Sequence, residues 1–283
     1  MSKLKLKRNP YSKQISKKLE NLLDVTYTLR SEEGCPWDRA QSLPDLRQYV
    51  LEETYEVLQA MDQTNLPGLK EELGDLLFQV IFLSQMMQEQ GQFTLLEVLE
   101  NVIEKMISRH PHVFGSSSAG SPEQALQSWE SMKDRQKALK KGSERSILDG
   151  IPLQLPALQQ ALMISTKAVR VGFEWDTEED VWKKLDEEIR EFKEAATDEH
   201  RAEELGDILF TIVNVARKRK INPEDALRVA NEKFRTRFGK LEKRVYSRNQ
   251  QLTDLTLAEM DAIWEEIKEE FRKGFGESEG SKK

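Results

Sequence analysis

Residues 71–78 read Glu-Glu-Leu-Gly-Asp-Leu-Leu-Phe, and residues 203–210 repeat this stretch as Glu-Glu-Leu-Gly-Asp-Ile-Leu-Phe. Further blocks recur around the two copies in the same order. The paired blocks are 51–56 with 186–191, Trp37-Asp38 with Trp175-Asp176, Glu104-Lys105 with Glu232-Lys233, and Trp129-Glu130 with Trp264-Glu265. Because the order is kept while the spacing drifts by a few residues, the sequence predicts a duplicated domain.

The repeat divides the 283 residues into two domains of ordinary size. A linker is expected where two glycines and two prolines follow a basic run. The predicted organisation is a basic tail at 1–18, a first repeat at 19–140, a linker at 141–156, a second repeat at 157–273 and a tail at 274–283.

Each repeat is predicted to be a bundle of α-helices. Apolar residues recur with a period near 3.6, and no segment alternates with the period of a β-strand. The chain has only 14 glycines and 9 prolines, so few residues interrupt helices. Asn222 followed by Pro223 predicts a helix start. The expected helices span 46–61, 70–90, 95–108, 181–196, 201–220, 223–245 and 257–273.

Composition excludes several classes of protein. Cys35 is the single cysteine, which rules out a disulfide framework and a zinc site made of cysteines. The basic start lacks the apolar segment of a secretory signal, and no apolar run is as long as a membrane span, so we expect a cytoplasmic protein. The formal net charge of -7 disfavours non-specific binding to a nucleic-acid polymer.

The acidic residues of each repeat fall on two neighbouring helices. Their spacing places them on one face of each helix, and the short connection makes the two helices antiparallel. Convergent carboxylates repel one another, so the pattern predicts a hard dication, Mg²⁺ or Mn²⁺. These residues are Glu52, Glu53, Glu56, Glu72 and Asp75 in the first repeat, and Glu187, Glu188, Glu191, Glu204 and Asp207 in the second.

A following helix in each repeat supplies two cations. Lys105 and Arg109 lie four residues apart, as do Lys233 and Arg237, so each pair shares a helix face and can meet phosphate oxygens. An acidic face, a dication and a basic face together predict a polyphosphate site. The alternative interpretation is an acidic helix face exposed to solvent.

Other features leave alternatives open. Gly74 and Gly206 each cost about 1 kcal/mol in a helix interior, and close helix packing is one explanation for them. Trp175 and Trp264 fit either a core or a stacked nucleobase. A di-iron carboxylate bundle would need Glu-x-x-His, a motif that does not occur in the sequence.

These motifs resemble the signature of the MazG nucleoside triphosphate pyrophosphohydrolases. The resemblance lies in Glu-Glu-x-x-Glu followed by Glu-x-x-Asp in both repeats, and in the stretches 34–38, 109–114, 171–175 and 230–234. It covers residues 19–273 and matches the tandem two-domain members. It implies an all-α pyrophosphatase fold, a homodimer, and Mg²⁺-dependent hydrolysis of NTPs and dNTPs to the monophosphate and pyrophosphate.

The resemblance also implies roles for individual residues. Phosphate contacts fall on Lys233 and Arg237, and a nucleotide contact falls on Trp264. We expect Glu187 or Glu188 to activate the attacking water, and turnover to require Glu204. The implied metal ligands are Glu53, Glu56, Glu72 and Asp75 in the first repeat, and Glu188, Glu191, Glu204 and Asp207 in the second.

One difference between the repeats favours the second as the catalytic one. Asn231 precedes Glu232-Lys233, whereas the aligned Ile103 offers no hydrogen bond to a sugar or phosphate. Asn231 is therefore a predicted substrate contact. The alternative is that one repeat, the first, is a non-catalytic module for nucleotide binding or dimerisation. A helical scaffold without a ligand is a third hypothesis.

Overall fold

The computed structural model describes residues 6–115, 117–140 and 146–279. The chain divides into two compact units, Met1–Ser143 and Glu144–Lys283. Helices build both units, and the described ranges contain no strand, which confirms the predicted all-α class.

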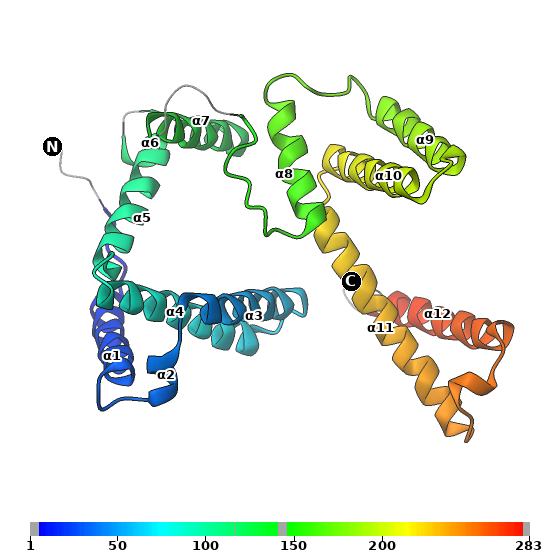
Figure 1. Ribbon diagram of the computed structural model, residues 1–283, viewed down its shortest axis with the longest axis horizontal. Coiled ribbons are helices and arrows are strands. Elements are labelled where there is room, and N and C mark those ends of the chain that lie inside the picture. Colours follow the sequence, from blue (N-terminus) through cyan, green and yellow to red (C-terminus); the bar gives the residue numbers. More distant parts are fainter. Residues whose placement is uncertain (1–5, 116, 141–145, 280–283) are drawn as a thin grey trace. The chain divides into compact units, whose positions relative to one another are not determined.

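The first unit is organised around a helical hairpin. Helices α3 and α4 run side by side, α1 and α5 contact α4, and α7 packs on α5 (Figure 1). The helices are α1 (Ser12–Arg30), α2 (Pro36–Ala40), α3 (Leu43–Asp62), α4 (Leu66–Glu89), α5 (Leu95–Arg109), α6 (Pro111–Phe114) and α7 (Pro122–Lys140).

The second unit repeats the hairpin with α9 and α10. Helix α8 packs on α10, and the long α11 forms a second pair with α12 (Figure 1). The elements are α8 (Ala157–Val169), α9 (Glu178–Glu194), α10 (Asp198–Lys218), α11 (Pro223–Ser247), a short 3₁₀ turn η1 (Leu252–Asp254) and α12 (Leu257–Glu279).

Side-chain caps fix where the site-bearing helices begin. The Thr177 hydroxyl oxygen accepts from the Asp180 backbone N–H at 3.2 Å, while the Asp180 carboxylate accepts from the Thr177 N–H, forming the capping box of α9. The Asn222 side chain accepts from the Glu224 backbone N–H at 3.0 Å. The helix start predicted at Asn222 is therefore confirmed.

Buried apolar clusters hold the helix pairs together. Burial of such side chains is the main favourable term in forming each pair. The cluster between α3 and α4 contains Leu46, Phe82, Met86 and Met87, and the cluster between α11 and α12 contains Leu241, Val245, Ile263 and Ile267.

Some boundaries differ from those expected. Helix α1 begins at Ser12, inside the stretch predicted as a tail, and α12 runs to Glu279, beyond the predicted end at residue 273. Helices α7 and α8 were not among the expected elements. The sequence of α7 is largely polar, so an apolar period carries little signal there.

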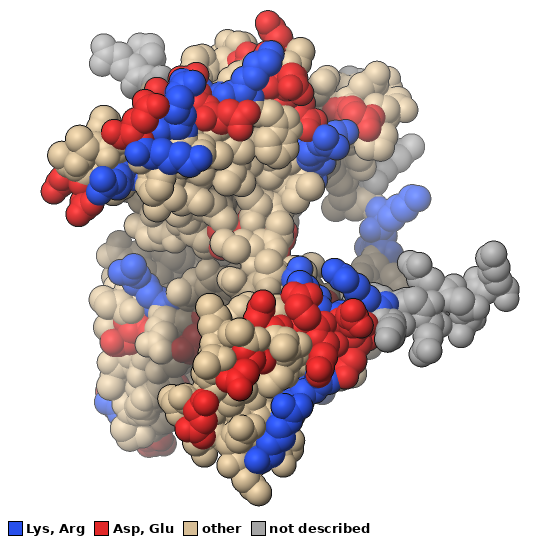
Figure 2. All heavy atoms as spheres, turned by 90° about the vertical axis from the view of Figure 1, so that its right-hand side faces the viewer, with Lys and Arg blue, Asp and Glu red and all other residues tan. Residues whose placement is uncertain are grey.

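The visible surface mixes both signs of charge. Figure 2 shows acidic and basic side chains interspersed, with uncharged areas between them. Every helix in the described ranges is too short or too polar to cross a membrane.

Candidate functional site

Two helix pairs, α3–α4 and α9–α10, bring acidic side chains together. In each pair, three glutamates each place one carboxylate oxygen within 4.8 Å of the others. We call these sets the first carboxylate group, made of Glu53, Glu56 and Glu72, and the second carboxylate group, made of Glu188, Glu191 and Glu204. The structure thus gathers three of the four metal ligands that the resemblance implies in each repeat.

The fourth implied ligand of each repeat lies just outside its group. Asp75 and Asp207 are both exposed and do not belong to either set of three. Their charges still reach the groups, because Asp75 helps to raise the pKa of Glu53 and Asp207 helps to raise that of Glu204. Each aspartate therefore borders the site that its repeat offers to a cation.

Carboxylate crowding is visible in the first group. Burial, followed by the charge of Asp75, raises the pKa of Glu53, although a hydrogen bond from Gln79 partly offsets this effect. Burial and the neighbouring Glu56 raise the pKa of Glu72. Like charges held this close favour a bound cation or a proton.

The second group contains the most deeply buried carboxylate of the site. Glu188 is 5% exposed, and the Lys184 Nζ lies 2.8 Å from its Oε1. The same ammonium donates to Glu187 Oε1 at 2.6 Å, and these hydrogen bonds raise the pKa of Lys184. Lys184 therefore fixes two acidic side chains at once.

This arrangement separates the two predicted bases. The hydrogen bond from Lys184 lowers the pKa of Glu187, and Glu187 stays outside the second carboxylate group. Glu188 belongs to the group. Of the two glutamates, Glu188 alone therefore shares a possible cation site with Glu191 and Glu204.

Glu204 completes the second group from α10. Burial, and then the charge of Glu191, raises its pKa, while His200 acts in the opposite direction. The His200 Nε2 lies 3.4 Å from Glu204 Oε1, one helical turn away. A cation or a proton bound to Glu204 would therefore relieve the unfavourable burial of its negative charge.

Sequence reasoning missed Lys184 and His200. The available signal was their spacing of four residues from Glu188 and Glu204, which places each on the same helix face as its partner. The first repeat has Tyr49 where the second has Lys184. Tyr49 packs on the α3–α4 cluster and meets the Trp37 ring edge-on at 6.1 Å. The second carboxylate group therefore has a lysine at a position where the first has a tyrosine.

The donor set fits a hard dication. Each group offers carboxylate oxygens from two facing helices and no thiol, a choice typical of Mg²⁺ or Mn²⁺ sites that also bind substrate phosphates. The residues that would hold the ion in the second repeat are Glu188, Glu191 and Glu204, with Asp207 at the border.

The chain is similar to known proteins over most of its length. The MazG nucleotide pyrophosphohydrolase domain matches residues 41–114 and 176–241. The chain is 42% identical over 249 residues to the nucleoside triphosphate pyrophosphohydrolase/pyrophosphatase MazG of Thermotoga maritima, covering 88% of this chain and 95% of that protein. It is 41% identical over 256 residues to the nucleoside triphosphate pyrophosphohydrolase of Escherichia coli K12, covering 88% and 97%. The chain belongs to the MazG family.

Both carboxylate groups fall within the matched MazG segments. The first group lies in residues 41–114 and the second in residues 176–241. Among solved structures, the crystal structure of a mazG-related protein from Thermotoga maritima aligns with 41% of this chain and 98% of that chain, at 29% identity and a TM-score of 0.36.

In the first MazG repeat, the predicted phosphate contact Arg109 lies against helix α7. The Arg109 Nε donates to Gln136 Oε1 at 2.9 Å, and its guanidinium lies 5.5 Å from the Trp129 ring centroid. Both partners belong to α7. Lys105 is half-buried on the same helix as Arg109.

The corresponding cations of the second MazG repeat lie on α11, where it pairs with α12 (Figure 1). The Arg237 guanidinium lies 5.5 Å from the Phe271 ring centroid, and its buried Nε has no hydrogen-bond partner among the residues that the structure describes. Asn231 and Lys233 are exposed. Within the described part of the chain, no ion pair joins Lys233 or Arg237 to the second carboxylate group.

Trp264 packs against other side chains of the second unit. It packs on the α11–α12 cluster and contacts the Phe234 ring at 5.1 Å between centroids. A contact of Trp264 with nucleotide stays a prediction.

The glycines beside the carboxylates are not explained by close packing in the described residues. A Cβ at Gly74 or Gly206 would meet no heavy atom within 4 Å beyond its chain neighbours and its own helix backbone. Both positions lie on exposed helix surface.

Gly206→Ala is therefore expected to stabilise the chain by about 0.5–1 kcal/mol, because alanine restricts the unfolded chain and favours a helix. The urea midpoint of the metal-free protein measures this effect, and Gly74→Ala is the matched variant in the first repeat. A lower midpoint for Gly206→Ala would mean that a group outside the described residues lies too close to this position for a Cβ atom.

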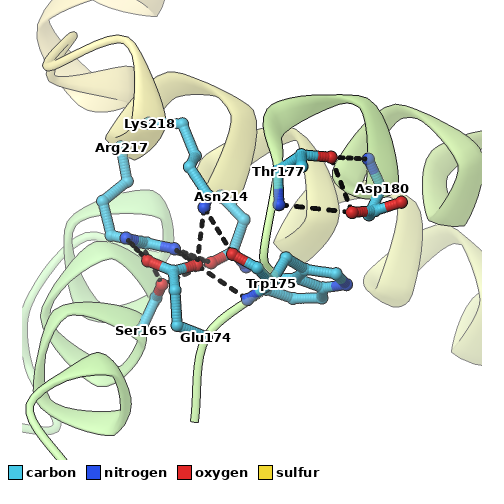
Figure 3. A network of polar contacts seen from close by, with 8 residues as sticks. All are labelled: Ser165, Glu174, Trp175, Thr177, Asp180, Asn214, Arg217 and Lys218. Atoms are coloured by element: carbon cyan, nitrogen blue, oxygen red, sulfur yellow. Dashed lines mark hydrogen bonds and ion pairs between the residues drawn. The ribbon is translucent and has the colours of Figure 1, made fainter. Parts of the chain in front are cut away.

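An ion pair fastens the loop that precedes α9 (Figure 3). The Arg217 guanidinium binds both oxygens of the Glu174 carboxylate at 2.7 Å, and Lys218 lies 3.2 Å from Glu174 Oε1. Mainly because of Arg217, the pKa of Glu174 is lowered to about 2. This pair joins the loop to α10.

Glu174→Gln is expected to destabilise the chain by about 1–2 kcal/mol at neutral pH, because it leaves a half-paired guanidinium. The folded-state pKa lies below the unfolded value, so the stabilisation is present above pH 5 and disappears as the pH falls towards 2. Urea midpoints at pH 7 and pH 3 should show a larger difference at pH 7. Exposed Glu194→Gln serves as control, and an equal difference at both pH values would contradict the assignment.

Proposed function

We propose that this chain hydrolyses nucleoside triphosphates to nucleoside monophosphate and pyrophosphate, with its active centre in the second MazG repeat. The observation that carries the proposal is the second carboxylate group, where the buried Glu188 faces Glu191 and Glu204 and is fixed by Lys184. The named relatives with this activity support the choice of reaction.

The residues of this group have separable tasks. A bound Mg²⁺ or Mn²⁺ would neutralise phosphate charge and lower the pKa of a coordinated water. Glu188, Glu191, Glu204 and Asp207 would hold the ion, and Lys184 keeps Glu188 in position. A carboxylate of the group accepts the proton of the water that attacks the α-phosphorus. Pyrophosphate then leaves in line with that water.

The leaving pyrophosphate carries charge that cations must stabilise. Lys233 and Arg237 are suited to this task, since they lie four residues apart on α11 and the Arg237 Nε has no partner in the described chain. Among the described residues, no ion pair joins Lys233 or Arg237 to the carboxylates of their own chain. A second copy of the chain can supply them.

We therefore propose a homodimer. Its support is an exposed apolar stripe on α10, which we define as Leu205, Leu209 and Ile212, each 44–47% exposed. The aligned residues of α4, namely Leu73, Leu77 and Val80, are 43–51% exposed. Exposed apolar surface of this kind marks protein interfaces.

The alternative of a non-catalytic first repeat also has a specific observation in its favour. The first carboxylate group keeps its three glutamates, yet Tyr49 replaces the lysine that steadies the second group. The first repeat can therefore bind a cation and nucleotide without turning it over.

A product assay tests the proposed reaction. Purified protein is incubated with Mg²⁺ and a panel of NTPs and dNTPs, and pyrophosphate is resolved from orthophosphate. Pyrophosphate with monophosphate is the expected result. Orthophosphate with diphosphate would refute attack at the α-phosphorus, and absence of product would refute the reaction altogether.

A further inference from the structure

The basic stretch at the start of the chain has no part in the reaction proposed above. Residues 1–18 contain seven Lys and Arg and no Asp or Glu, whereas the remaining 265 residues hold 36 Lys and Arg against 50 Asp and Glu. Such segregation of charge is typical of a segment that meets an anionic partner. We call residues 6–18 the basic segment, and residues 12–18 of it form the first two turns of α1 (Figure 1).

Every side chain of the basic segment is exposed. Thr26 is the buried residue of α1, and Ile15 lies three turns before it on the same helix face, yet Ile15 is 54% exposed. A helix in a protein gains most of its stability from the face that it packs. The first two turns of α1 therefore leave their apolar face open to a partner.

Two more apolar side chains are interleaved with the cations of the basic segment. Leu6 is 60% exposed and Tyr11 is 65% exposed. The Tyr11 backbone N–H donates to the Asn9 side-chain oxygen at 2.9 Å, and the Ile15 N–H donates to the Tyr11 carbonyl at 2.9 Å. This turn fixes Tyr11 at the head of α1, four residues before Ile15 and on the same face. The segment thus offers three large apolar side chains to a partner.

The cations of the basic segment are available to an anion. Lys17 pairs with Glu20 at 3.0 Å, but the two side chains are 70% and 62% exposed, and such surface pairs contribute little. A helix is about 10 Å across, close to the Debye length of about 10 Å at 0.1 M salt, so cations on either side of α1 act on a surface that the helix touches. The remaining cations form no ion pair with another described residue, and they are Lys7, Arg8, Lys13 and Lys18.

We propose that the basic segment binds the surface of an anionic phospholipid bilayer, lying on it without crossing it. The lysines and Arg8 are attracted to anionic headgroups, while Leu6, Tyr11 and Ile15 enter the boundary between headgroups and acyl chains. Tyrosine is favoured at this boundary. A nucleic acid would meet the cations but leave Leu6 and Ile15 in water, so the bilayer is the partner that satisfies both kinds of side chain. The acidic remainder of the chain is repelled by the same surface.

Vesicle flotation of the full chain tests this binding. The vesicles contain phosphatidylcholine alone, or phosphatidylcholine with about one third phosphatidylglycerol, at about 0.1 M salt. We expect the chain to float with the anionic vesicles only. The cation variant carries Lys7→Gln, Arg8→Gln and Lys13→Gln, and its partition coefficient should fall by about 100-fold. The apolar variant carries Leu6→Ser and Ile15→Ser, and its partition coefficient should fall by about tenfold. All five side chains are exposed, so the fold should be unaffected.

The matched control removes the same charge from exposed positions of the second unit, by Lys193→Gln, Lys243→Gln and Arg248→Gln. It should float like the wild type. The proposal would be overturned if the wild type did not float with anionic vesicles, or if the control lost as much binding as the cation variant. Unchanged binding in the apolar variant would overturn it as well.

Two other occupants of the basic segment would give different results. Fluorescence anisotropy measures binding of a labelled single-stranded RNA. Binding of this RNA by the wild type but not by the cation variant, without flotation, would assign the segment to nucleic acid and overturn the lipid assignment. Sedimentation velocity without lipid measures the mass of the apolar variant. A mass below that of the wild type would place a second copy of the chain on the segment instead of a bilayer.

Discussion

Glu204→Gln is expected to lower pyrophosphate release by about 100-fold or more, since it removes a charged oxygen donor at the point where the dication and the phosphates meet. Glu204 is the only member of the second carboxylate group contributed by α10. Without this donor, the remaining glutamates of the group are Glu188 and Glu191, which both lie on α9. The measurement is the initial rate of pyrophosphate release from ATP with saturating Mg²⁺.

The same substitution should not damage the fold. Burial, and then the neighbouring carboxylates, raise the pKa of Glu204, so its charge is unfavourable in the metal-free protein. A neutral amide of the same shape relieves that repulsion. The melting temperature of Glu204→Gln without Mg²⁺ should therefore equal or exceed that of the parent, and the stabilisation by Mg²⁺ should be smaller.

Glu72→Gln is the matched control in the first carboxylate group. If the first repeat is a non-catalytic module, this variant keeps most of the turnover. Loss of turnover in Glu72→Gln with retention in Glu204→Gln would move the active centre to the first repeat. Equal loss in both variants would mean that the two repeats act together.

Repetition made the carboxylates predictable. A single Glu-Glu-x-x-Glu is common on solvated helices, but its recurrence with Glu-x-x-Asp specified two helix pairs and the faces that meet. Local spacing places Glu188 and Glu191 on one face of α9. The short connection to α10 makes the two helices antiparallel neighbours, and Glu204 then joins the group.

The rest of the site depends on tertiary contacts that spacing does not encode. The contact of Lys184 with Glu188 follows from their spacing, but the burial of Glu188 depends on tertiary packing. The contacts of Arg109 with Gln136 and Trp129 depend on α7, a helix that was not expected from the sequence. The second unit also has a cavity of about 420 Å³ beside Trp175, and one of its walls is α8, which was not expected either.

The paired substitution Leu209→Lys with Ile212→Lys is expected to convert a dimer to monomers and to lower turnover by about 100-fold. Both residues lie in the α10 stripe and are 46% and 44% exposed, so two lysines cost little in the folded monomer. In an apolar interface, each ammonium would lose its hydration without gaining a partner. Sedimentation velocity measures the mass, and pyrophosphate release measures the turnover.

Turnover should fall with the dimer if Lys233 and Arg237 of one copy act on the second carboxylate group of the other copy. This group lies on α9 and α10, while Lys233 and Arg237 lie on α11 beside α12. Leu257→Lys is the control, since Leu257 is 79% exposed and lies outside the stripe. A fully active monomeric double variant would show that a single chain supplies every group, and an intact dimer would place the interface on another surface.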